Sequence, residues 1–221
     1  MRVLVPELLD LLAADNPRAI RSRRDLARIN VVMGQSRIMA KALAQFPPPS
    51  LMADLGGGDG RFLLSVARRL HWRDVKALIL DRQDIVSRQT KDAFTALGWS
   101  CEVVQGDIFE TLPRLFPDIV TANLFLHHLQ ERDLKQLHGF IAARARGFVA
   151  CEPRRSAFAL LGAHLVFALG ANDVTRHDAV ASVRAGFTNR ELSALWPRGD
   201  GWCLQEHGTF PFTHLLAARH A

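Results

Sequence analysis

The chain of 221 residues has no tyrosine, only three cysteines and only four lysines. The cysteines, Cys101, Cys151 and Cys203, stand far apart and form no Cys-x-x-Cys or histidine–cysteine spacing typical of a metal site. This pattern argues against a disulfide framework and against a bound metal, and it favours reduced thiols in the cytoplasm. Without tyrosine, histidine becomes the first candidate wherever a proton must be removed near neutral pH.

Long apolar runs are also missing. The N-terminal residues 1–17 are interrupted by Pro6, Glu7 and Asp10, so they do not resemble a secretion signal. The longest apolar run, residues 156–171, is too short to span a bilayer comfortably and contains His164. We expect a soluble protein in which this run forms a buried or substrate-covering helix.

The net charge of +6 is carried almost wholly by arginine. Most of the excess lies in residues 16–30, and a basic surface of this kind could favour nucleic acid. We interpret the segment first as a solvated helix face and second as a contact for phosphate or an anionic substrate.

From residue 51 onward, strand-length apolar runs alternate with helical periodicities. The pattern predicts strands at 51–55, 75–81, 101–107, 118–124 and 147–153, and helices at 60–71, 84–98 and 130–145. Asp84 is the expected cap of the second of these helices, which stops at Gly98. Such alternation is typical of a mostly parallel sheet covered by helices on both faces.

The two ends of the chain differ from this pattern. Runs at 202–207 and 210–219, separated by a turn with Gly208, predict an antiparallel hairpin that brings the sheet to seven strands. Residues 1–48 are expected to form helices that end at Pro47–Pro49. We therefore divide the chain into a helical N-terminal cap (1–48) and an α/β domain (49–221).

A glycine-rich turn, Gly56-Gly57-Gly58-Asp59-Gly60, follows the first predicted strand. In a doubly wound sheet, ligands bind outside the carboxyl ends of the strands, where glycines let the backbone approach them. A dinucleotide would need Gly-x-Gly-x-x-Gly, but Arg61 replaces the last glycine and Asp59 puts a negative charge where pyrophosphate would sit. The turn is therefore a poor dinucleotide site.

The stretch "ADLGGGDG" resembles the first motif of class I S-adenosylmethionine-dependent methyltransferases. "ALILD" ends in Asp81, "QGDIF" places Asp107 after the third strand, and "DIVTANLFLHHL" resembles the family's fourth motif. Order and spacing match over roughly residues 50–150. The resemblance implies a Rossmann-like class I fold, S-adenosylmethionine as cofactor, and a methyltransferase activity.

The resemblance also implies roles for individual residues. Asp81 would accept the ribose hydroxyl protons, and Asp107 would bind the adenine amino group. The full set of implied cofactor-binding residues is Asp54, Gly56, Gly58, Gly60, Asp81, Asp107, Ile108 and Asn123.

Methylation of a hydroxyl requires a base, and three histidines are candidates. His127 and His128 follow the fourth strand, beside the implied reaction centre. His177 precedes Asp178 in a polar patch expected just ahead of a helix that carries Val180, Val183 and Phe187 inward, and it is narrowly our first choice. Substrate contacts are expected from Arg176, Asp178 and Glu152.

The absence of certain motifs reduces the number of possible classes of methyl acceptor. The fourth motif lacks the Asn/Asp-Pro-Pro-aromatic signature of base amine methylation, and no Pro-Cys pair or acidic hairpin of the protein-arginine type is present. "FLHHL" resembles enzymes that methylate quinone precursors, phenols and polyketides, which implies a small, largely apolar acceptor methylated on oxygen. C-methylation of a quinone precursor, a non-catalytic cofactor-binding subunit, an RNA methyltransferase and a dinucleotide reductase stay open, as does a homodimer.

Overall fold

Parallel strands with helices between them build most of the chain. The computed structural model describes residues 2–13, 15–165, 170–199 and 201–220. Its strands are β1 (Leu51–Leu55), β2 (Val75–Asp81), β3 (Trp99–Gln105), β4 (Ile119–Asn123), β5 (Gly147–Pro153), β6 (Trp202–Thr209) and β7 (Thr213–His220). Its α-helices are α1 (Pro17–Val32), α2 (Gln35–Leu43), α3 (Arg61–Leu70), α4 (Arg88–Ala96), α5 (Ile108–Thr111), α6 (Glu131–Arg144), α7 (Ala157–Leu165) and α8 (Asp173–Ala185). Short 3-10 helices include η1 (Leu9–Leu11), η2 (Leu112–Arg114), η3 (Leu126–His128) and η5 (Ser193–Leu195).

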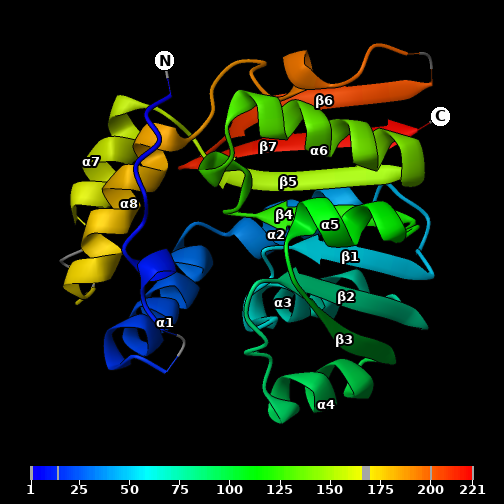
Figure 1. Ribbon diagram of the computed structural model, residues 1–221, viewed down its shortest axis with the longest axis horizontal. Coiled ribbons are helices and arrows are strands. Elements are labelled where there is room, and N and C mark those ends of the chain that lie inside the picture. The colour runs from blue at the N-terminus through cyan, green and yellow to red at the C-terminus, as the bar shows by residue number, and fades with distance from the viewer. Residues whose placement is uncertain (1, 14, 166–169, 200, 221) are drawn as a thin grey trace.

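The strands form one seven-stranded sheet in the order β3-β2-β1-β4-β5-β7-β6 (Figure 1). Strands β1 to β5 run parallel, and β7 is inserted antiparallel between β5 and β6. This confirms the predicted parallel sheet with an antiparallel C-terminal hairpin. Since β2 and β4 flank β1 on opposite sides, the switch in strand order that favours ligand binding lies beside β1.

Apolar side chains cover both faces of the sheet. One core packs α2, α3 and α4 against strand residues such as Met52 and Ile79. The other packs α5, α6 and η5 against their neighbours in sequence, such as Ala53 and Leu80. Successive strand residues thus alternate between two buried faces, which explains why these strands are apolar throughout.

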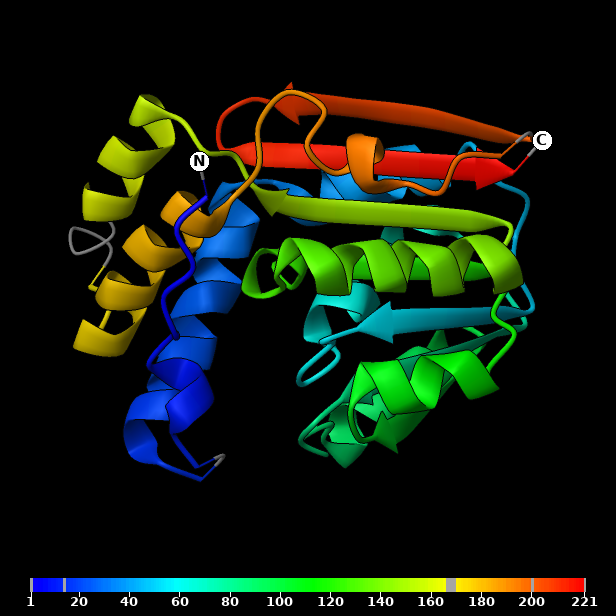
Figure 2. The ribbon, with the colours of Figure 1, turned by 45° about the horizontal axis from the view of Figure 1, so that its top comes forward.

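A group of helices lies beyond the carboxyl ends of the parallel strands. Figures 1 and 2 show α1, α7 and α8 together at that end of the sheet, with the N-terminal segment running across α8. Helix α1 packs on α8 through Ser22, whose hydroxyl accepts a hydrogen bond from Thr175 (2.9 Å). Helix α2 instead lies on the sheet, so the residues predicted as one helical cap divide between two locations.

Three local expectations need correction. Ser87, not Asp84, caps α4, because its hydroxyl accepts the Thr90 N–H (3.1 Å). The C-terminal turn lies after Thr209, whereas Gly208 belongs to β6 and pairs with His214. The predicted hairpin is confirmed, but its turn was placed too early in the sequence.

The third correction concerns the helices between β5 and β6. Helix α8 already begins at Asp173, so the predicted polar patch lies inside the helix and not ahead of it. Helix α7 buries only small side chains and leaves Phe158, Leu161 and Leu165 about half exposed, so of the two expectations the buried helix is wrong and the substrate-covering helix stays a prediction. Residues 166–169 of that predicted helix lie outside the described residues. Across the described chain, we find no helix with both the length and the apolar character needed to cross a membrane.

Candidate active site

The turn after β1 is held by the neighbouring strand. The Gly56 N–H donates to the carbonyl oxygen of Leu80 (2.8 Å), and the Gly58 N–H donates to Oδ2 of Asp81 (2.9 Å). Gly56, Gly58 and Gly60 have positive φ angles of 62°, 56° and 74°, a conformation that other residues rarely adopt. The backbone path of the turn therefore depends on these glycines.

The glycines differ in what surrounds them. A Cβ atom on Gly56 would lie 2.2 Å from the ring of Phe125, and one on Gly57 would lie 2.8 Å from Oδ2 of Asp54. A Cβ atom on Gly58 would meet nothing within 4 Å among the described residues. The protein itself thus fills the space beside Gly56 and Gly57, and it leaves open space beside Gly58.

Asp54 lies beneath the turn and is almost fully buried. The Thr121 hydroxyl donates to its Oδ1 (2.7 Å). Burial raises the pKa of the Asp54 carboxyl to about 7; the Thr121 hydrogen bond opposes this shift and the charge of Asp81 adds to it. Asp54 is therefore poised to change its charge near neutral pH.

Two further acids end the neighbouring strands. Asp81 also accepts the Gln83 N–H at its Oδ1 (2.9 Å), so each of its carboxylate oxygens accepts a hydrogen bond from a backbone N–H. Asp107 caps α5 by accepting the Phe109 N–H (2.9 Å), and Arg82 donates to its other oxygen (3.1 Å). Each carboxylate oxygen has a second lone pair, so these contacts leave capacity for a ligand.

Asn123 ends β4, and its side-chain oxygen is buried without a hydrogen-bond partner among the described residues. A buried polar atom without a partner is uncommon and costly in a folded protein. At the end of a central strand, next to the glycine turn, such an oxygen suggests a donor supplied by a ligand.

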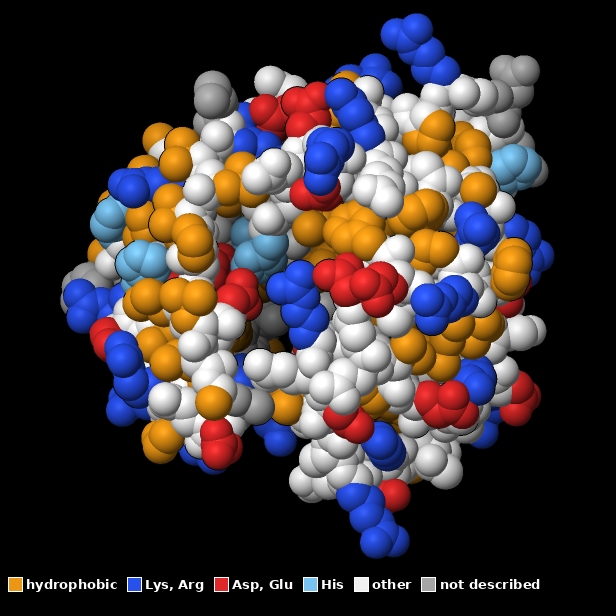
Figure 3. Space-filling view, viewed as in Figure 1, with side chains coloured by type: hydrophobic (Ala, Val, Ile, Leu, Met, Phe, Trp, Pro, Cys, Tyr) orange, Lys and Arg blue, Asp and Glu red, His pale blue; other side chains and the backbone are white. Residues whose placement is uncertain are grey.

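The predicted cofactor residues therefore lie along one edge, at the ends of β3, β2, β1 and β4. Neighbouring positions are joined directly, as by the Gly58–Asp81 hydrogen bond and by a hydrogen bond from Gly106 N–H to the Asp81 carbonyl (3.0 Å). In the space-filling view the face is hollowed near its centre, between the N-terminal segment, α1 and α8 on one side and the sheet on the other (Figure 3).

His127 is locked between two carboxylates. Its Nδ1 lies 2.7 Å from Oε2 of Glu152 and its Nε2 lies 3.2 Å from Oε1 of Glu7. Burial disfavours charge on His127, but the hydrogen bonds to Glu152 and Glu7 outweigh it and raise its pKa to about 9. Since carboxylates only accept hydrogen bonds, both ring nitrogens donate, and His127 is a charged structural residue with no free nitrogen for a base.

Glu152 organises the loop that follows β4. Its carboxylate is fully buried and accepts the backbone N–H groups of Phe125 (3.0 Å) and Leu126 (2.8 Å) in addition to His127. The loop is therefore fixed relative to the end of β5. The sequence suggested Glu152 as a substrate contact; in the structure its carboxylate holds the loop after β4 through Phe125, Leu126 and His127.

The N-terminal segment, residues 2–11, covers this loop and is called the strap below. Arg2 donates to the carbonyl oxygens of His127 (3.0 Å) and Leu129 (3.1 Å) and lies over the ring of Phe187. Glu7 binds His127 and also accepts a hydrogen bond from Ser182 of α8. Nothing in the local sequence reveals that the strap reaches the fourth motif.

His128 differs from its neighbour. Its side chain is 27% exposed and its Nδ1 lies 3.5 Å from Oδ2 of Asp10 in the strap. Its ring centre is 6.5 Å from that of Phe125, which packs on Gly56 of the glycine turn. Burial and the charge of His127 lower the pKa of His128, so it is neutral at pH 7. A neutral, partly exposed histidine beside the glycine turn is suited to accept a proton.

His177 lies on α8, at the contact of this helix with α7. It lines a hollow of about 430 Å³ between α7 and α8, together with Arg176 and His164. Its Nδ1 lies 2.9 Å from Oδ1 of Asp178, but the same carboxylate also accepts the backbone N–H groups of Leu8 (2.8 Å) and Leu9 (3.0 Å). Asp178 thus anchors the strap. Among the described residues, no recorded contact joins His177 to the glycine turn.

Ligand atoms of Glu7, His127 and His128 lie within 4.8 Å of one another, close enough to surround a cation. Both nitrogens of His127 are already hydrogen-bonded to carboxylates. A cation at this place would have to displace the proton shared by His127 and Glu7. We interpret the cluster as an ion-paired network.

Comparison of the sequence with protein-family models and with curated proteins gives no match. Comparison of the structure with solved structures does find matches. The chain has the class I methyltransferase fold. The plantazolicin methyltransferase BamL, solved with a triazolic desmethylPZN analog and SAH, superimposes with a TM-score of 0.68 at 11% identity over 96% of this chain and 92% of that one.

Two larger proteins are also similar. An O-methyltransferase family protein from Burkholderia thailandensis gives a TM-score of 0.58 at 16% identity over 94% of this chain, and the mitomycin 7-O-methyltransferase MmcR gives 0.59 at 18% over 96%. This chain spans 63% and 60% of their lengths, respectively. At such low identity the likeness establishes the fold, and the activity has to be argued from the site.

Proposed function

We propose that this protein transfers the methyl group of S-adenosylmethionine to a hydroxyl of a small, largely apolar acceptor. The observation that carries the proposal is the open space beside Gly58, bordered by Asp81, in a fold shared with solved methyltransferases. The neighbours named above include O-methyltransferases and one structure with bound SAH, which supports both the cofactor and an oxygen acceptor.

The residues at the strand ends fit this cofactor. Asp81 would hold the ribose hydroxyls, and Asp107 with Ile108 would border the adenine. The unpaired oxygen of Asn123 offers an acceptor for the amino group of the cofactor, and the carboxyl of Asp54, whose pKa burial raises to about 7, lies beneath the turn. When bound, S-adenosylmethionine supplies an activated methyl group, so the chain has mainly to position the acceptor and exclude water.

We assign proton removal from the acceptor hydroxyl to His128. Its position beside Phe125, its exposure and its lowered pKa support this role, and Asp10 would stabilise the imidazolium that forms. His127, Glu152 and Glu7 would hold the loop in which His128 stands. This proposal replaces His177 as the first candidate, because that histidine lines the hollow between α7 and α8 and pairs with Asp178.

The test is a pair of measurements on the purified chain. Calorimetry should show binding of S-adenosylhomocysteine, and methyl transfer from labelled S-adenosylmethionine should appear with some members of a panel of phenols and polyketide-type hydroxyls. Binding without turnover across the panel would favour a non-catalytic subunit or an acceptor methylated on carbon. Failure to bind the cofactor would disprove the proposal.

The cysteines indicate the cellular compartment. Cys101, Cys151 and Cys203 are all free thiols, which fits a reducing compartment, and we propose the cytoplasm. An RNA substrate is the alternative that the arginine-rich helix α1 keeps open.

A further inference from the structure

The side-chain amide of Gln35, the first residue of α2, is fully buried. Among the described residues, neither its oxygen nor its nitrogen has a hydrogen-bond partner. Asn30, in the last turn of α1, likewise has a buried side-chain oxygen without a partner there. Such atoms are uncommon, because an unpaired buried polar group destabilises the folded chain. The junction of α1 and α2 therefore retains hydrogen-bonding capacity that the described protein does not use.

Gln35 lies on the side of α2 that packs against the sheet. Gln35, Met39 and Leu43 follow one another at intervals of four residues, which places them on one face of the helix. All three side chains are fully buried. Met39 and Leu43 belong to the core between this helix and the sheet. The amide of Gln35 is therefore the polar end of an apolar stripe.

The direction of α2 places Gln35 at the carboxyl edge of the sheet. Phe46, three residues beyond α2, packs on Gly147 at the start of β5, where an added Cβ would lie 2.5 Å from its ring. The nine residues of α2 rise about 13 Å, the length of about four strand residues. The first turn of α2 therefore lies level with Cys151, which pairs with Asn123. Figures 1 and 2 show α1 leading into α2 at this end of the sheet.

The side chain of Asn123 points to the same face of the sheet. Ile119 of β4 packs in one core with Met39 of α2. Side chains alternate between the two faces along a strand, so Asn123, four residues after Ile119, points to the same side. The unpaired oxygen of Asn123 and the amide of Gln35 thus share one edge and one face of the sheet.

The cofactor residues described above supply acceptors but no side-chain donor. Asp54, Asp81 and Asp107 carry carboxyl groups, and the Gly58 N–H already donates to Asp81. The amino-acid end of S-adenosylmethionine has an ammonium group, which suits these acceptors, and a carboxylate, which does not. A primary amide offers two N–H donors. The start of a helix also favours negative charge, and no side-chain hydrogen bond caps the start of α2.

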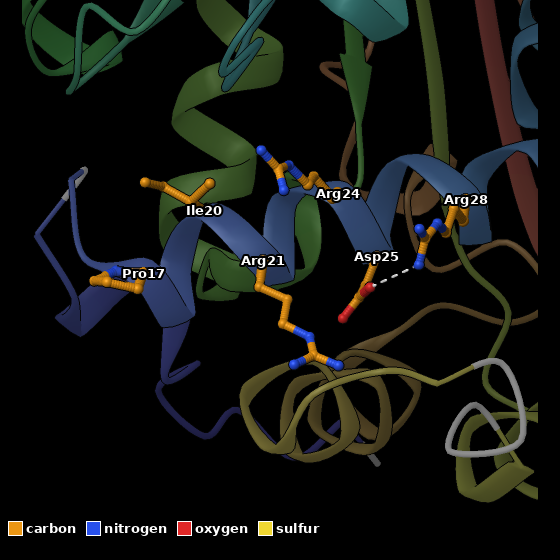
Figure 4. A pocket seen from close by; sticks show the side chains of 6 residues that line it. All are labelled: Pro17, Ile20, Arg21, Arg24, Asp25 and Arg28. Carbon is orange, nitrogen blue, oxygen red and sulfur yellow. Dashed lines mark hydrogen bonds and ion pairs between the residues drawn. The ribbon is translucent and has the colours of Figure 1, made fainter.

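The arginines of α1 are less suited to this carboxylate. Figure 4 shows Arg21 and Arg24 extending toward opposite sides of the helix, so their guanidinium groups do not converge on one anion. Arg28 lies 3.5 Å from Oδ1 of Asp25. The amide of Gln35 is the better-placed donor, because it faces the edge of the sheet where the cofactor is expected.

We propose that the side-chain N–H groups of Gln35 donate to the carboxylate of bound S-adenosylmethionine, while Asn123 accepts from its ammonium group. Gln35 is enclosed by protein, so the cofactor reaches it by displacing α1, which contacts both α2 and α3. This inference rests on the proposed function. It adds to the cofactor site a residue that precedes β1 and lies outside the motifs of the sheet.

The test uses calorimetry on the full chain with two ligands, S-adenosylhomocysteine and its decarboxylated analogue, which keeps the amino group. We expect the wild type to bind S-adenosylhomocysteine on the order of tenfold more tightly, the effect of a charge-assisted hydrogen bond. Gln35→Met, which has a similar size but no hydrogen-bond donor, should lose this preference. Gln45→Met, at an exposed position just beyond the same helix, should keep it.

A melting curve without ligand separates cofactor binding from a structural role. Gln35→Met should melt at the temperature of the wild type or above it, because it removes two buried polar atoms that have no partner among the described residues. A lower melting temperature, together with an equal loss of affinity for both ligands, would show that the amide supports the fold. That result would overturn the inference.

Three other results would also overturn it. The first is equal binding of the two ligands by the wild type, and the second is an unchanged preference in Gln35→Met. The third is an equal loss of affinity for both ligands at an unchanged melting temperature, which would assign the amide to the amino group or the nucleoside. If the wild type binds neither ligand, the proposed function itself fails, and the inference fails with it.

Discussion

The backbone N–H of Gly58 donates to the Asp81 carboxylate at 2.9 Å, which ties the glycine turn to the end of β2. The two residues are 23 positions apart in the sequence, and the hydrogen bond joins the turn after β1 to the last residue of β2. The side of Gly58 that faces away from the protein is open.

A methyl group at this position should block the cofactor. We expect Gly58→Ala to abolish calorimetric binding of S-adenosylhomocysteine, because its Cβ would occupy the open space. Alanine at positive φ also costs about 1–2 kcal/mol of stability. Gly34→Ala is the matched control, since Gly34 also has positive φ (65°) and nothing within 4 Å of an added Cβ. Equal affinity of the two variants for S-adenosylhomocysteine would contradict the assignment of the cofactor site to Gly58.

Removing the charge of Asp81 should weaken the cofactor without breaking the turn. Asp81→Asn keeps one oxygen for the Gly58 N–H, but it loses the acceptor for the Gln83 N–H and the charged acceptor for the ribose hydroxyls. We expect the affinity for S-adenosylhomocysteine to fall by about 1–3 kcal/mol. Asp84→Asn, an exposed acid nearby, should bind normally. An unchanged affinity in Asp81→Asn would place the ribose elsewhere.

His128 should be needed for turnover but not for cofactor binding. His128→Ala is expected to lower kcat by roughly 10²–10⁴ with little effect on S-adenosylhomocysteine affinity. His177→Ala should stay active. Burial and the charge of His127 lower the pKa of His128. The turnover rate of the wild type should therefore fall as the pH is lowered below 6.5 and His128 becomes protonated. The reverse ranking of the two variants would restore His177 as the base.

The clamp on His127 should make folding stability depend on pH. Its folded-state pKa of about 9 exceeds the ordinary value, so its contribution is complete below about pH 6.5 and is lost as the pH rises through about 9. The expected loss is on the order of 3 kcal/mol in urea unfolding between these limits. Glu7→Gln should reduce the pH dependence by removing one of the two carboxylates. Stability that rises over this range would disprove a charged His127.

Chelation should leave the activity intact. Since both His127 nitrogens bind carboxylates, we expect EDTA-treated protein to keep its turnover and its melting temperature. Loss of turnover in EDTA, with recovery on adding zinc or manganese, would show instead that Glu7, His127 and His128 hold a cation.

The strands and the glycine turn could be predicted because they depend on local patterns. Residues 51–55 and 75–81 are strands as the apolar runs indicate, and the positive φ angles of Gly56 and Gly58 justify their glycines. The boundary of α4 was predicted three residues early, because Asp84 and Ser87 are both good caps and only the hydrogen bond to Thr90 decides between them.

The environment of the histidines could not be read in the same way. Glu7 and Glu152 lie 120 and 25 residues from His127, and no local pattern connects them. His177 looked suitable because an acid follows it directly. In the structure that acid also anchors the strap, a role visible only once α8 and residues 8–9 are placed together.

The insertion of β7 between β5 and β6 has a consequence for how the protein is made. The residues that complete the interior of the sheet, Thr213–His220, are synthesised after the other six strands. Until they leave the ribosome, β5 presents an open edge of unpaired backbone N–H and C=O groups that can pair with other chains. A translation product that stops before residue 213 would therefore retain the glycine turn and the histidine loop, yet it would be prone to aggregate and to be degraded.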